Sequence, residues 1–172
     1  FRNKTFGYHS GTMKVVFENG KVYFGSARTN YFLKAFFSDL CSRPSCYECN
    51  FKHIQHKSDL TLYDGWHASE LANIEDDDRG YTNIIIQSNK GKEILDGLKT
   101  LKKYPIDTLK AVELDGIMVE NSVEWNDKRE RFFDNINNEN IEEHCLRFMK
   151  ISLKDKFIEK MKRIYYIRKF NG

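Results

Sequence analysis

The stretch Met13-Lys14-Val15-Val16-Phe17-Glu18-Asn19-Gly20-Lys21-Val22-Tyr23-Phe24 decides the fold class at the start of the chain. Two β-prone runs flank Asn19-Gly20, and an Asn-Gly pair in this position is the strongest short hairpin signal. The stretch therefore predicts a β-hairpin over residues 13–24. Similar β-prone runs predict strands near 59–63 and 82–87. In the second of these, the adjacent isoleucines Ile84–Ile86 indicate a strand buried on both faces.

Helical periodicity takes over between and after these strands. Apolar residues at positions 33, 36, 37 and 40 follow the i, i+3, i+4, i+7 pattern of an amphipathic helix. A turn at Asn89-Lys90-Gly91 is expected to precede a second helix with its apolar stripe at 94–101. The last third predicts helices over about 127–136 and 138–150, and a final one opening at Ser152, where Asp155 completes a capping box. The expected fold class is α+β, with a small mixed sheet that includes the N-terminal hairpin, covering helices and a helical C-terminal tail.

The composition is that of a folded globular domain. Hydrophobic residues make up 40% and charged residues 31% of 172 residues, which excludes a disordered chain. No apolar stretch approaches the roughly 18 residues of a membrane span, and no signal-peptide core is present, so we expect a cytoplasmic protein. We expect a single domain over 1–172, with an α+β core at 1–103 and a mostly helical extension at 104–172. Because the chain lacks an initiator Met, we expect it to be the C-terminal fragment of a longer protein.

The charge is distributed unevenly although the net charge is only +3. Residues 146–172 carry nine basic and two acidic side chains, whereas residues 61–145 carry ten basic and nineteen acidic ones. A basic segment of this kind is usually a solvated helix face. Since the sequence has no RNA-binding signature and no glycine- or arginine-rich tract, we expect no nucleic-acid partner.

The cysteines form the most informative constellation. Cys41, Cys46 and Cys49 fall within nine residues, and Cys145 lies far downstream. Pro44 is expected to break the preceding helix and to leave Cys46 and Cys49 in a loop. Thiolates are soft ligands, and C-x4-C-x2-C with a distant fourth cysteine has the form of a ferredoxin-type arrangement. All four cysteines are therefore candidate ligands of a 4Fe-4S cluster, and unrelated buried or free thiols are the alternative.

Zinc is the alternative metal. Cys46, Cys49, His53 and His56 would supply two sulfur and two nitrogen atoms, enough for a tetrahedral site. All four ligands would then come from one tight loop. Ordinary loop histidines among Lys52 and Lys57 are the plainer explanation of His53 and His56.

A second informative stretch is 58–66, Ser-Asp-Leu-Thr-Leu-Tyr-Asp-Gly-Trp. A strand that ends in Asp64-Gly65-Trp66 brings a carboxylate and an aromatic plane to its exit, where α/β proteins commonly bind ligands. Asp64 is the one catalytic candidate, and a turn aspartate beside a core tryptophan is the alternative. The triplet Asp76–Asp78 either binds a hard cation or forms a solvated turn. The sequence has no Ser-His-Asp order, P-loop or G-x-G-x-x-G motif.

Four motifs occur together in this order and spacing: Arg43–Lys52, Ser58–Trp66, Asp76–Gly80 and Gly91–Glu93. With the upstream hairpin, they make residues 1–103 similar to a known family. The chain resembles the C-terminal domain of the coenzyme F-420 hydrogenase/dehydrogenase beta subunit family.

The resemblance implies an iron–sulfur flavoprotein oxidoreductase. It would move electrons between a 4Fe-4S cluster, FAD and a deazaflavin or other organic acceptor. The family also includes the 7-hydroxymethyl chlorophyll a reductase and many bacterial members associated with polysaccharide synthesis. Implied partners are an electron-donor protein or a ferredoxin-like N-terminal domain, together with a small-molecule acceptor, and we expect the isolated fragment to be inactive.

The resemblance also assigns residues. Cys46 and Cys49 are the best cluster ligands and Cys41 comes next, whereas Cys145 is either the fourth ligand or a buried helix thiol, with another ligand expected from an N-terminal part. The implied cofactor-binding residues are Asp59, Asp64 and Trp66. Where the family usually has Gly-Asp-Phe-Trp-Gly, this chain has Tyr63-Asp64-Gly65-Trp66-His67, and a tyrosine in place of the first glycine would hinder close approach of a cofactor.

Two other functions are compatible with the same residues. One is a zinc-stabilised, non-enzymatic binding or scaffolding domain. The other is a metal-free fragment whose cysteines stay reduced and which has no activity of its own.

Overall fold

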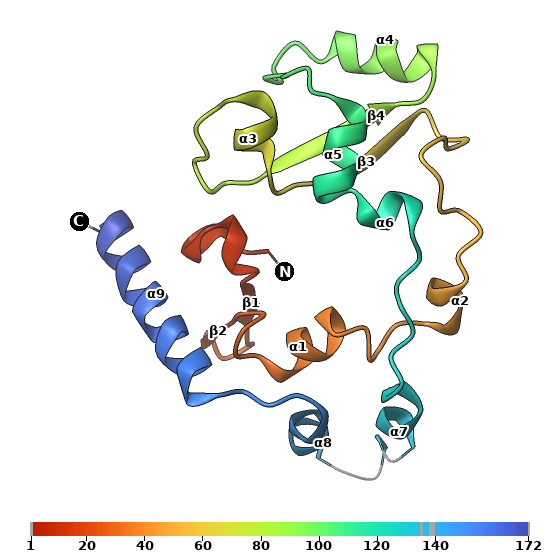
Figure 1. Cartoon of the computed structure of the whole chain (residues 1–172). Helices are drawn as coiled ribbons and strands as arrows, with labels where there is room; N and C mark the ends of the chain where they lie inside the picture. The colour runs from red at the N-terminus through yellow and green to blue at the C-terminus, as the bar shows by residue number, and fades with distance from the viewer. Residues whose placement is uncertain (1, 135, 138–139, 172) are drawn as a thin grey trace. The chain divides into compact units, whose positions relative to one another are not determined.

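The computed structural model describes residues 2–134, 136–137 and 140–171. The chain forms two compact units, unit 1 with residues 1–47 and 124–172 and unit 2 with residues 48–123. The predicted α+β class is confirmed, since helices and short antiparallel strands alternate along the chain (Figure 1). Unit 1 thus combines the two ends of the chain, and the predicted single domain with an α+β core at 1–103 and a helical extension at 104–172 stays a prediction. Within the described residues, every helix is too short or too polar to cross a membrane.

The predicted hairpin lies in unit 1. After two 3-10 turns, η1 (Lys4–Phe6) and η2 (Tyr8–Ser10), strand β1 (Met13–Val16) pairs antiparallel with β2 (Val22–Gly25). Gly20 at the tip has a φ of 77°, and its N–H donates to the carbonyl of Phe17 over 2.9 Å. A positive φ of this size favours glycine, which is why the Asn-Gly signal locates the turn correctly.

The helices of unit 1 gather around one buried cluster. Helix α1 (Tyr31–Phe37) is capped by Asn30, and α7 (Arg129–Phe133) and α8 (Ile141–Phe148) follow late in the chain. Of the helices predicted over 127–136 and 138–150, residues 135, 138 and 139 lie outside the described residues. The core of the cluster consists of Ala35, Leu40, Phe132, Cys145 and Met149.

The segment Pro44–Tyr47 is helical, so the prediction of a loop is wrong for Cys46 and right for Cys49, which follows the helix and lies in no regular element. Helix α2 spans Pro44–Tyr47, so Cys46 lies in a short helix. The N–H of Cys46 donates to the carbonyl of Arg43 over 2.8 Å. Proline disrupts the interior of a helix, but it fits the first helical position. There the fixed φ of proline is already helical, and an N–H group would have no hydrogen-bond partner within the helix.

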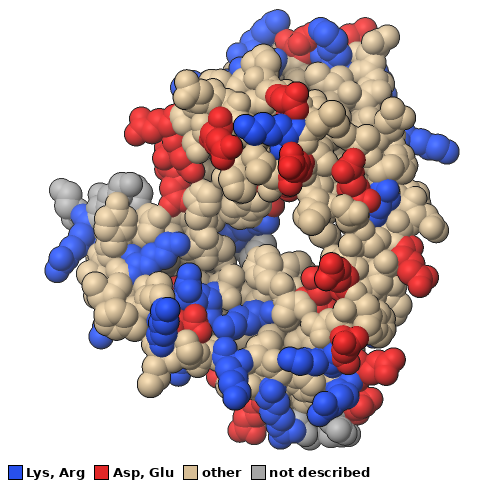
Figure 2. Space-filling model, in the orientation of Figure 1, with Lys and Arg blue, Asp and Glu red and all other residues tan. Residues whose placement is uncertain are grey.

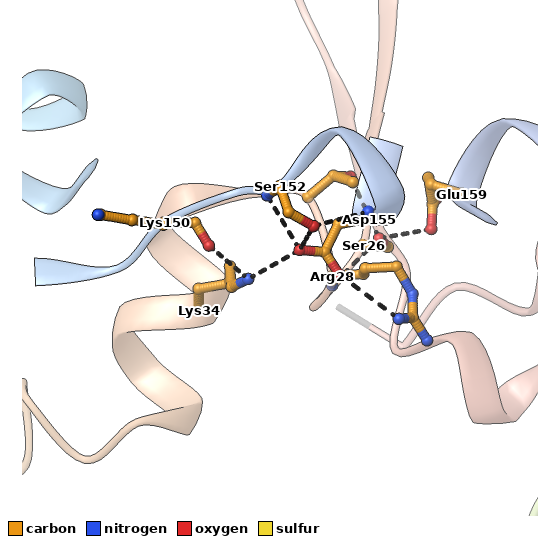
Figure 3. Close-up of polar contacts among 8 residues, drawn as sticks. Ser26, Arg28, Lys34, Lys150, Ser152, Asp155 and Glu159 are labelled. Carbon is orange, nitrogen blue, oxygen red and sulfur yellow. Dashed lines mark hydrogen bonds and ion pairs between the residues drawn. The ribbon is translucent and has the colours of Figure 1, made fainter. Parts of the chain in front are cut away.

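The last helix, α9 (Leu153–Asn171), begins with the predicted capping box. The Asp155 carboxylate accepts from the Ser152 N–H at 3.0 Å, and the Asp155 N–H donates to Ser152 Oγ at 3.0 Å. The same carboxylate lies 3.7 Å from Lys34 Nζ and 3.6 Å from an Arg28 guanidinium nitrogen (Figure 3). The capping box thus also joins the start of α9 to the segment after the hairpin.

One turn further along α9, a second contact fastens the helix to the hairpin. Ser26 Oγ donates to the Glu159 carboxylate over 2.8 Å, and both residues are buried (Figure 3). Arg163 donates to Glu159 and also to the backbone carbonyl of Phe24 on β2, the latter over 2.7 Å. A two-stranded hairpin is marginal in water by itself, so these contacts contribute to its stability.

The outer side of α9 is basic and partly apolar. Lys154, Lys156 and Lys160 are exposed, and Figure 2 shows Lys and Arg side chains along this helix. Leu153 and Phe157 are also exposed. Among the residues of α9 whose burial the structure describes, Glu159 is the one that is buried.

Unit 2 is built on a second antiparallel pair. Strand β3 (Leu60–Gly65) pairs with β4 (Tyr81–Ile86), with Leu60 opposite Ile86 and Gly65 opposite Tyr81. The described strands thus form two separate two-stranded sheets, and the single mixed sheet expected from the sequence is not found. Ile84 and Ile85 are half-buried and Ile86 is exposed, so the prediction of a strand buried on both faces is wrong; a two-stranded sheet has too few neighbours to be covered twice.

Short helices α3 (Ala68–Ala72), α4 (Asn89–Gly97), α5 (Thr108–Asp115) and α6 (Ile117–Glu120) complete unit 2. The expected turn at Asn89-Lys90-Gly91 is instead the first turn of α4, because Ser88 Oγ caps the helix by accepting from the Gly91 N–H at 3.1 Å. A Cβ at Gly91 would lie 2.2 Å from the backbone oxygen of Asp59. Only glycine lets α4 pack this closely on β3.

Candidate functional site

The four cysteines occupy different environments. Cys41 follows α1 and is exposed, Cys46 in α2 is half-buried, and Cys145 in α8 is buried; all three belong to unit 1. Cys49 is half-buried and belongs to unit 2, where its N–H donates to Ser122 Oγ over 3.1 Å.

The pKa values of two of these thiols are raised. Partial desolvation raises the pKa of the Cys41 thiol although the residue is exposed, and the Arg129 guanidinium partly offsets this. Burial also raises the pKa of Cys145, and the charge of Cys41 adds to the effect. Metal ligands are thiolates, and a raised pKa disfavours that form in the absence of a metal.

The described residues do not present a preformed metal centre. No group of three or more His, Cys, Asp or Glu side chains that could hold a metal ion occurs in the part of the chain that the structure describes. The donor set therefore does not fit a 4Fe-4S cluster as it stands, and ligation by Cys41, Cys46, Cys49 and Cys145 remains a prediction.

The histidines of the zinc alternative lie side by side in unit 2. The rings of His53 and His56 stack with centroids 5.0 Å apart and planes 19° apart. His56 Nε2 is buried and has no hydrogen-bond partner among the described residues. Two stacked imidazoles are a partial ligand set, because a structural zinc site needs four ligands.

Asp59, one of the three predicted cofactor-binding residues, holds unit 2 together. Its carboxylate accepts from Ser88 Oγ at 2.5 Å and lies 3.7 Å from Lys90 Nζ. Its backbone oxygen contacts α4 at Gly91 and accepts from the Gln87 N–H at 2.9 Å. These contacts join the residue before β3 to Gln87 and Ser88, which follow β4, and to the first turn of α4.

Unit 2 has a cavity beside strands β3 and β4. The other two predicted cofactor-binding residues, Asp64 and Trp66, lie at the end of β3 and directly after it. The cavity has a volume of about 660 Å³ and includes Tyr63, Asn83 and Tyr81 in its lining. Asp64 and Trp66 are half-buried and are not among the lining residues given for this cavity in the described structure. Side chains alternate along a strand, so Asp64 points to the sheet face opposite Tyr63. The residue that departs from the family pattern, Tyr63, is thus the one that lines the cavity.

Most of the cavity wall is apolar, with tyrosines set into it. A size of several hundred Å³ and an apolar wall with a few polar groups are typical of small-molecule sites. Burial raises the pKa of Tyr63, with a contribution from the Asp115 charge, and desolvation raises that of Tyr81, together with Asp77 and other acidic neighbours. Both phenols are therefore neutral hydrogen-bond donors at physiological pH. Further apolar wall residues are Ile74, Ile85, Leu95, Leu101, Pro105 and Ile106.

A buried carboxylate organises the polar end of this region. The Asp115 side chain, at the end of α5, has no exposed surface. One of its oxygens lies 2.6 Å from His67 Nδ1, and the other accepts from the His67 N–H and from Asn83 Nδ2, each at 3.1 Å. The carboxylate therefore joins the loop before α3, strand β4 and helix α5.

The sequence analysis does not predict this network, since Asn83 and Asp115 are not among its candidate residues and His67 enters it only as a departure from the family motif. One signal was available, the replacement by Tyr63 and His67 of the two glycines that bracket the family motif. The pairing of residues 48 positions apart, however, depends on where α5 packs.

The comparisons with known proteins agree with the resemblance. The family model for the C terminus of the coenzyme F420 hydrogenase/dehydrogenase beta subunit matches residues 4–111, more than half of the chain. No curated protein and no solved structure matches the chain significantly.

Proposed function

The chain belongs to the coenzyme F420 hydrogenase/dehydrogenase beta subunit family as its C-terminal region, and from this we propose that it serves an oxidoreductase that moves electrons between a 4Fe-4S cluster, a flavin and an organic acceptor. The family match over residues 4–111 is the observation that carries the proposal. Iron–sulfur and flavin cofactors would supply the redox chemistry. The protein would act in the cytoplasm as part of a larger redox assembly.

Within that assembly, unit 2 would contribute an organic-ligand site. The cavity of about 660 Å³ is large enough for a ring system, its tyrosines offer planar surfaces, and Tyr63 offers a neutral phenol, whereas the Tyr81 hydroxyl donates to the carbonyl of Glu75. A small-molecule acceptor is the ligand this chemistry favours. Cofactor binding by Asp59, Asp64 and Trp66 stays a prediction, and none of the three lines this cavity in the described structure.

The cysteines would contribute ligands only together with other parts of the assembly. Cys46 and Cys49 are the best candidates, with Cys41 and Cys145 next, and the described residues gather no complete set. Remaining ligands would come from an electron-donor protein or a ferredoxin-like N-terminal domain.

The test is the cofactor content of the complete protein, purified without oxygen. We expect a brown protein with iron, acid-labile sulfide and flavin. Cys46→Ser and Cys49→Ser should each lower iron and sulfide, while flavin content should change less. Comparison with Cys145→Ser then decides whether the buried thiol is a ligand.

Two outcomes would contradict the proposal. A colourless protein with stoichiometric zinc, lost in His53→Ala and His56→Ala, would favour the scaffolding domain, for which the buried Nε2 of His56 is the specific observation. A colourless protein with neither metal nor flavin would leave a metal-free fragment without redox activity.

A further inference from the structure

The last helix of unit 1, α9, turns a row of large apolar side chains to solvent. Leu153, Phe157, Met161 and Tyr165 are 84%, 64%, 49% and 58% exposed. These residues recur at every fourth position, and in a helix of 3.6 residues per turn such positions lie on one side. A helix that served only to cover a core would bury its apolar side. We call these four residues the outer stripe of α9.

Positive charge accompanies the outer stripe. Lys154, Lys156 and Lys160 are exposed, and Arg168 is exposed further along the helix (Figure 2). In the part of the chain that the structure describes, none of the three lysines forms an ion pair with an acidic side chain. The outer side of α9 therefore combines apolar side chains with cations that no carboxylate compensates.

The acidic residues of α9 lie on its other side. Asp155 and Glu159 are the two carboxylates between positions 153 and 171. Asp155 lies 3.7 Å from Lys34, and Glu159 is buried and accepts from Ser26 (Figure 3). Residues two positions apart in a helix point to nearly opposite sides, so Phe157 faces away from both carboxylates. Contacts with the hairpin segment thus engage one side of the helix and leave the opposite, cationic side accessible.

The composition of the outer side favours a lipid surface over a macromolecule. A nucleic acid would be bound by the lysines and would leave Leu153 and Phe157 in water. Protein interfaces are depleted in lysine and use arginine instead. Helices that lie in the plane of a bilayer combine lysine with leucine and phenylalanine. Since one side of α9 is already engaged, its occupant has to contact the helix from the other side alone, as a flat bilayer does.

We propose that the outer side of α9 is a binding surface for an anionic lipid bilayer, with the helix lying in the plane of the membrane surface. The outer stripe enters the boundary between headgroups and acyl chains. The lysine ammonium groups reach the lipid phosphates, because their four-carbon stems extend past the apolar side chains. The attraction requires negative lipid charge and weakens with salt. It goes beyond the proposed function and does not depend on electron transfer.

The experiment is sedimentation of the complete protein with sucrose-loaded vesicles. One set of vesicles contains phosphatidylcholine alone, and the other contains phosphatidylcholine with phosphatidylglycerol as the anionic lipid. We expect binding to the anionic vesicles to be at least about tenfold tighter than binding to the neutral ones. High salt should remove most of this difference, because it screens the lysine charges.

Two variants separate the contributions of charge and apolar area. Lys154→Gln combined with Lys160→Gln should weaken binding to the anionic vesicles roughly 30-fold, because two cations near the surface are lost. Phe157→Gln should weaken binding about tenfold on the same vesicles and leave the salt dependence in place. All three side chains are exposed, so circular dichroism of both variants should match that of the wild type.

Matched controls remove the same side-chain types elsewhere. Lys21→Gln combined with Lys99→Gln removes two exposed lysines, and Leu109→Gln removes a leucine that is 71% exposed in α5. Both controls should bind the anionic vesicles as the wild type does. Equal losses in the controls and in the α9 variants would overturn the proposal, since binding would then follow overall charge or apolar surface and not this helix.

Insertion of the outer stripe has its own readout. In Phe157→Trp, brominated lipids in the anionic vesicles should quench tryptophan fluorescence more strongly than in the wild type, because the added indole lies near the acyl chains. Sedimentation without this additional quenching would overturn the proposal. So would a wild-type protein that fails to sediment with anionic vesicles, and retention of that protein on polyglutamate or on nucleic acid would then assign the surface to an acidic macromolecule.

Discussion

Two aspartates, one in each unit, accept several hydrogen bonds, but one receives them from a residue close in the sequence and the other from residues far away in it. Asp155 in unit 1 takes two from Ser152, three residues away, and remains partly exposed beside Lys34 and Arg28. Asp115 in unit 2 takes its bonds from His67 and Asn83, which are 48 and 32 residues away, and is completely buried. The hydrogen bonds of Asp155 form a local capping motif, to which Lys34 and Arg28 add tertiary contacts. The hydrogen bonds of Asp115 can form only once unit 2 has folded.

The difference has an energetic side. Exposed charges are hydrated in the unfolded chain and exchange that hydration for modest contacts on folding. A buried carboxylate loses its hydration entirely and depends on each of its donors, so removal of one member leaves the others unsatisfied. The buried network is therefore the more sensitive of the two, and four substitutions test this from the largest expected effect to the smallest.

Asp115→Ala should cause the largest loss. It leaves the buried Asn83 amide and the His67 N–H without their acceptor, and we expect unit 2 to lose about 3 kcal/mol of unfolding free energy. Urea unfolding of the chain, followed by fluorescence, measures this. Asp96→Ala, at an exposed i, i+4 pair with Lys92, is the control and should leave the midpoint close to that of the wild type. Equal midpoints for the two variants would remove the claimed contrast.

Ser26→Ala should come second. Its hydroxyl is the buried donor to Glu159, whose carboxylate would keep its contact with Arg163 as its one polar partner among the described residues, so we expect a loss of about 1 to 2 kcal/mol in unit 1. Limited proteolysis should show faster cleavage at the hairpin. Ser58→Ala, at an exposed serine of unit 2, serves as the comparison; faster cleavage there as well would argue against a specific role for Ser26.

Ser152→Ala should cost about 1 kcal/mol, the usual value for loss of an N-cap side chain. The Asp155 N–H would lose its acceptor at the first turn of α9, while water can replace it at this exposed end. Circular dichroism during thermal unfolding measures the change. Ser152→Thr, which keeps the hydroxyl, should restore most of the stability; an unimproved threonine variant would contradict the capping role.

Asp155→Asn should have the smallest effect, and one that depends on pH. The hydrogen bonds from Ser152, with help from Lys34 and Arg28, hold the pKa of Asp155 below its ordinary value of 3.8. The ionised carboxylate therefore stabilises the folded chain above that value, and the advantage disappears as the pH falls through the folded pKa. Urea midpoints of both proteins should differ at neutral pH and converge in acid. A difference between the two urea midpoints that stays constant with pH would contradict a stabilising role of the ionised Asp155 carboxylate.

Local signals predicted the parts of the fold that local chemistry decides. Asn19-Gly20 located the hairpin because its turn needs a positive φ, and Ser152 with Asp155 located the start of α9 because the two side chains satisfy its first N–H groups. Pro44 and Gly91 led to wrong predictions of a loop and a turn. Each of these residues is common where a helix ends, and each also fits the first turn of a helix, where the structure has it. Only the contact of Gly91 with the Asp59 carbonyl, or the fit of Pro44 to a first helical position, decides between the two.

The candidate site was less predictable than the fold, because its contacts depend on tertiary packing and not on local signals. The family motifs could be recognised from sequence, and the match over residues 4–111 confirms the family. Asp59 could be singled out within a motif, but its contacts with Ser88 and Gly91 depend on how α4 packs. The meeting of His67, Asn83 and Asp115 depends on the docking of α5, which no spacing in the sequence encodes.

The fastening of the first hairpin by the last helix has a consequence for biosynthesis. Ser26 and Glu159 are 133 residues apart, so a ribosome has to add all the intervening residues before their hydrogen bond can form. Until then the nascent hairpin has exposed strand edges and little to hold it, and we expect chaperones or proteases to recognise it during that interval. Chains that terminate before α9 should accordingly be degraded, even though they contain every residue of unit 2.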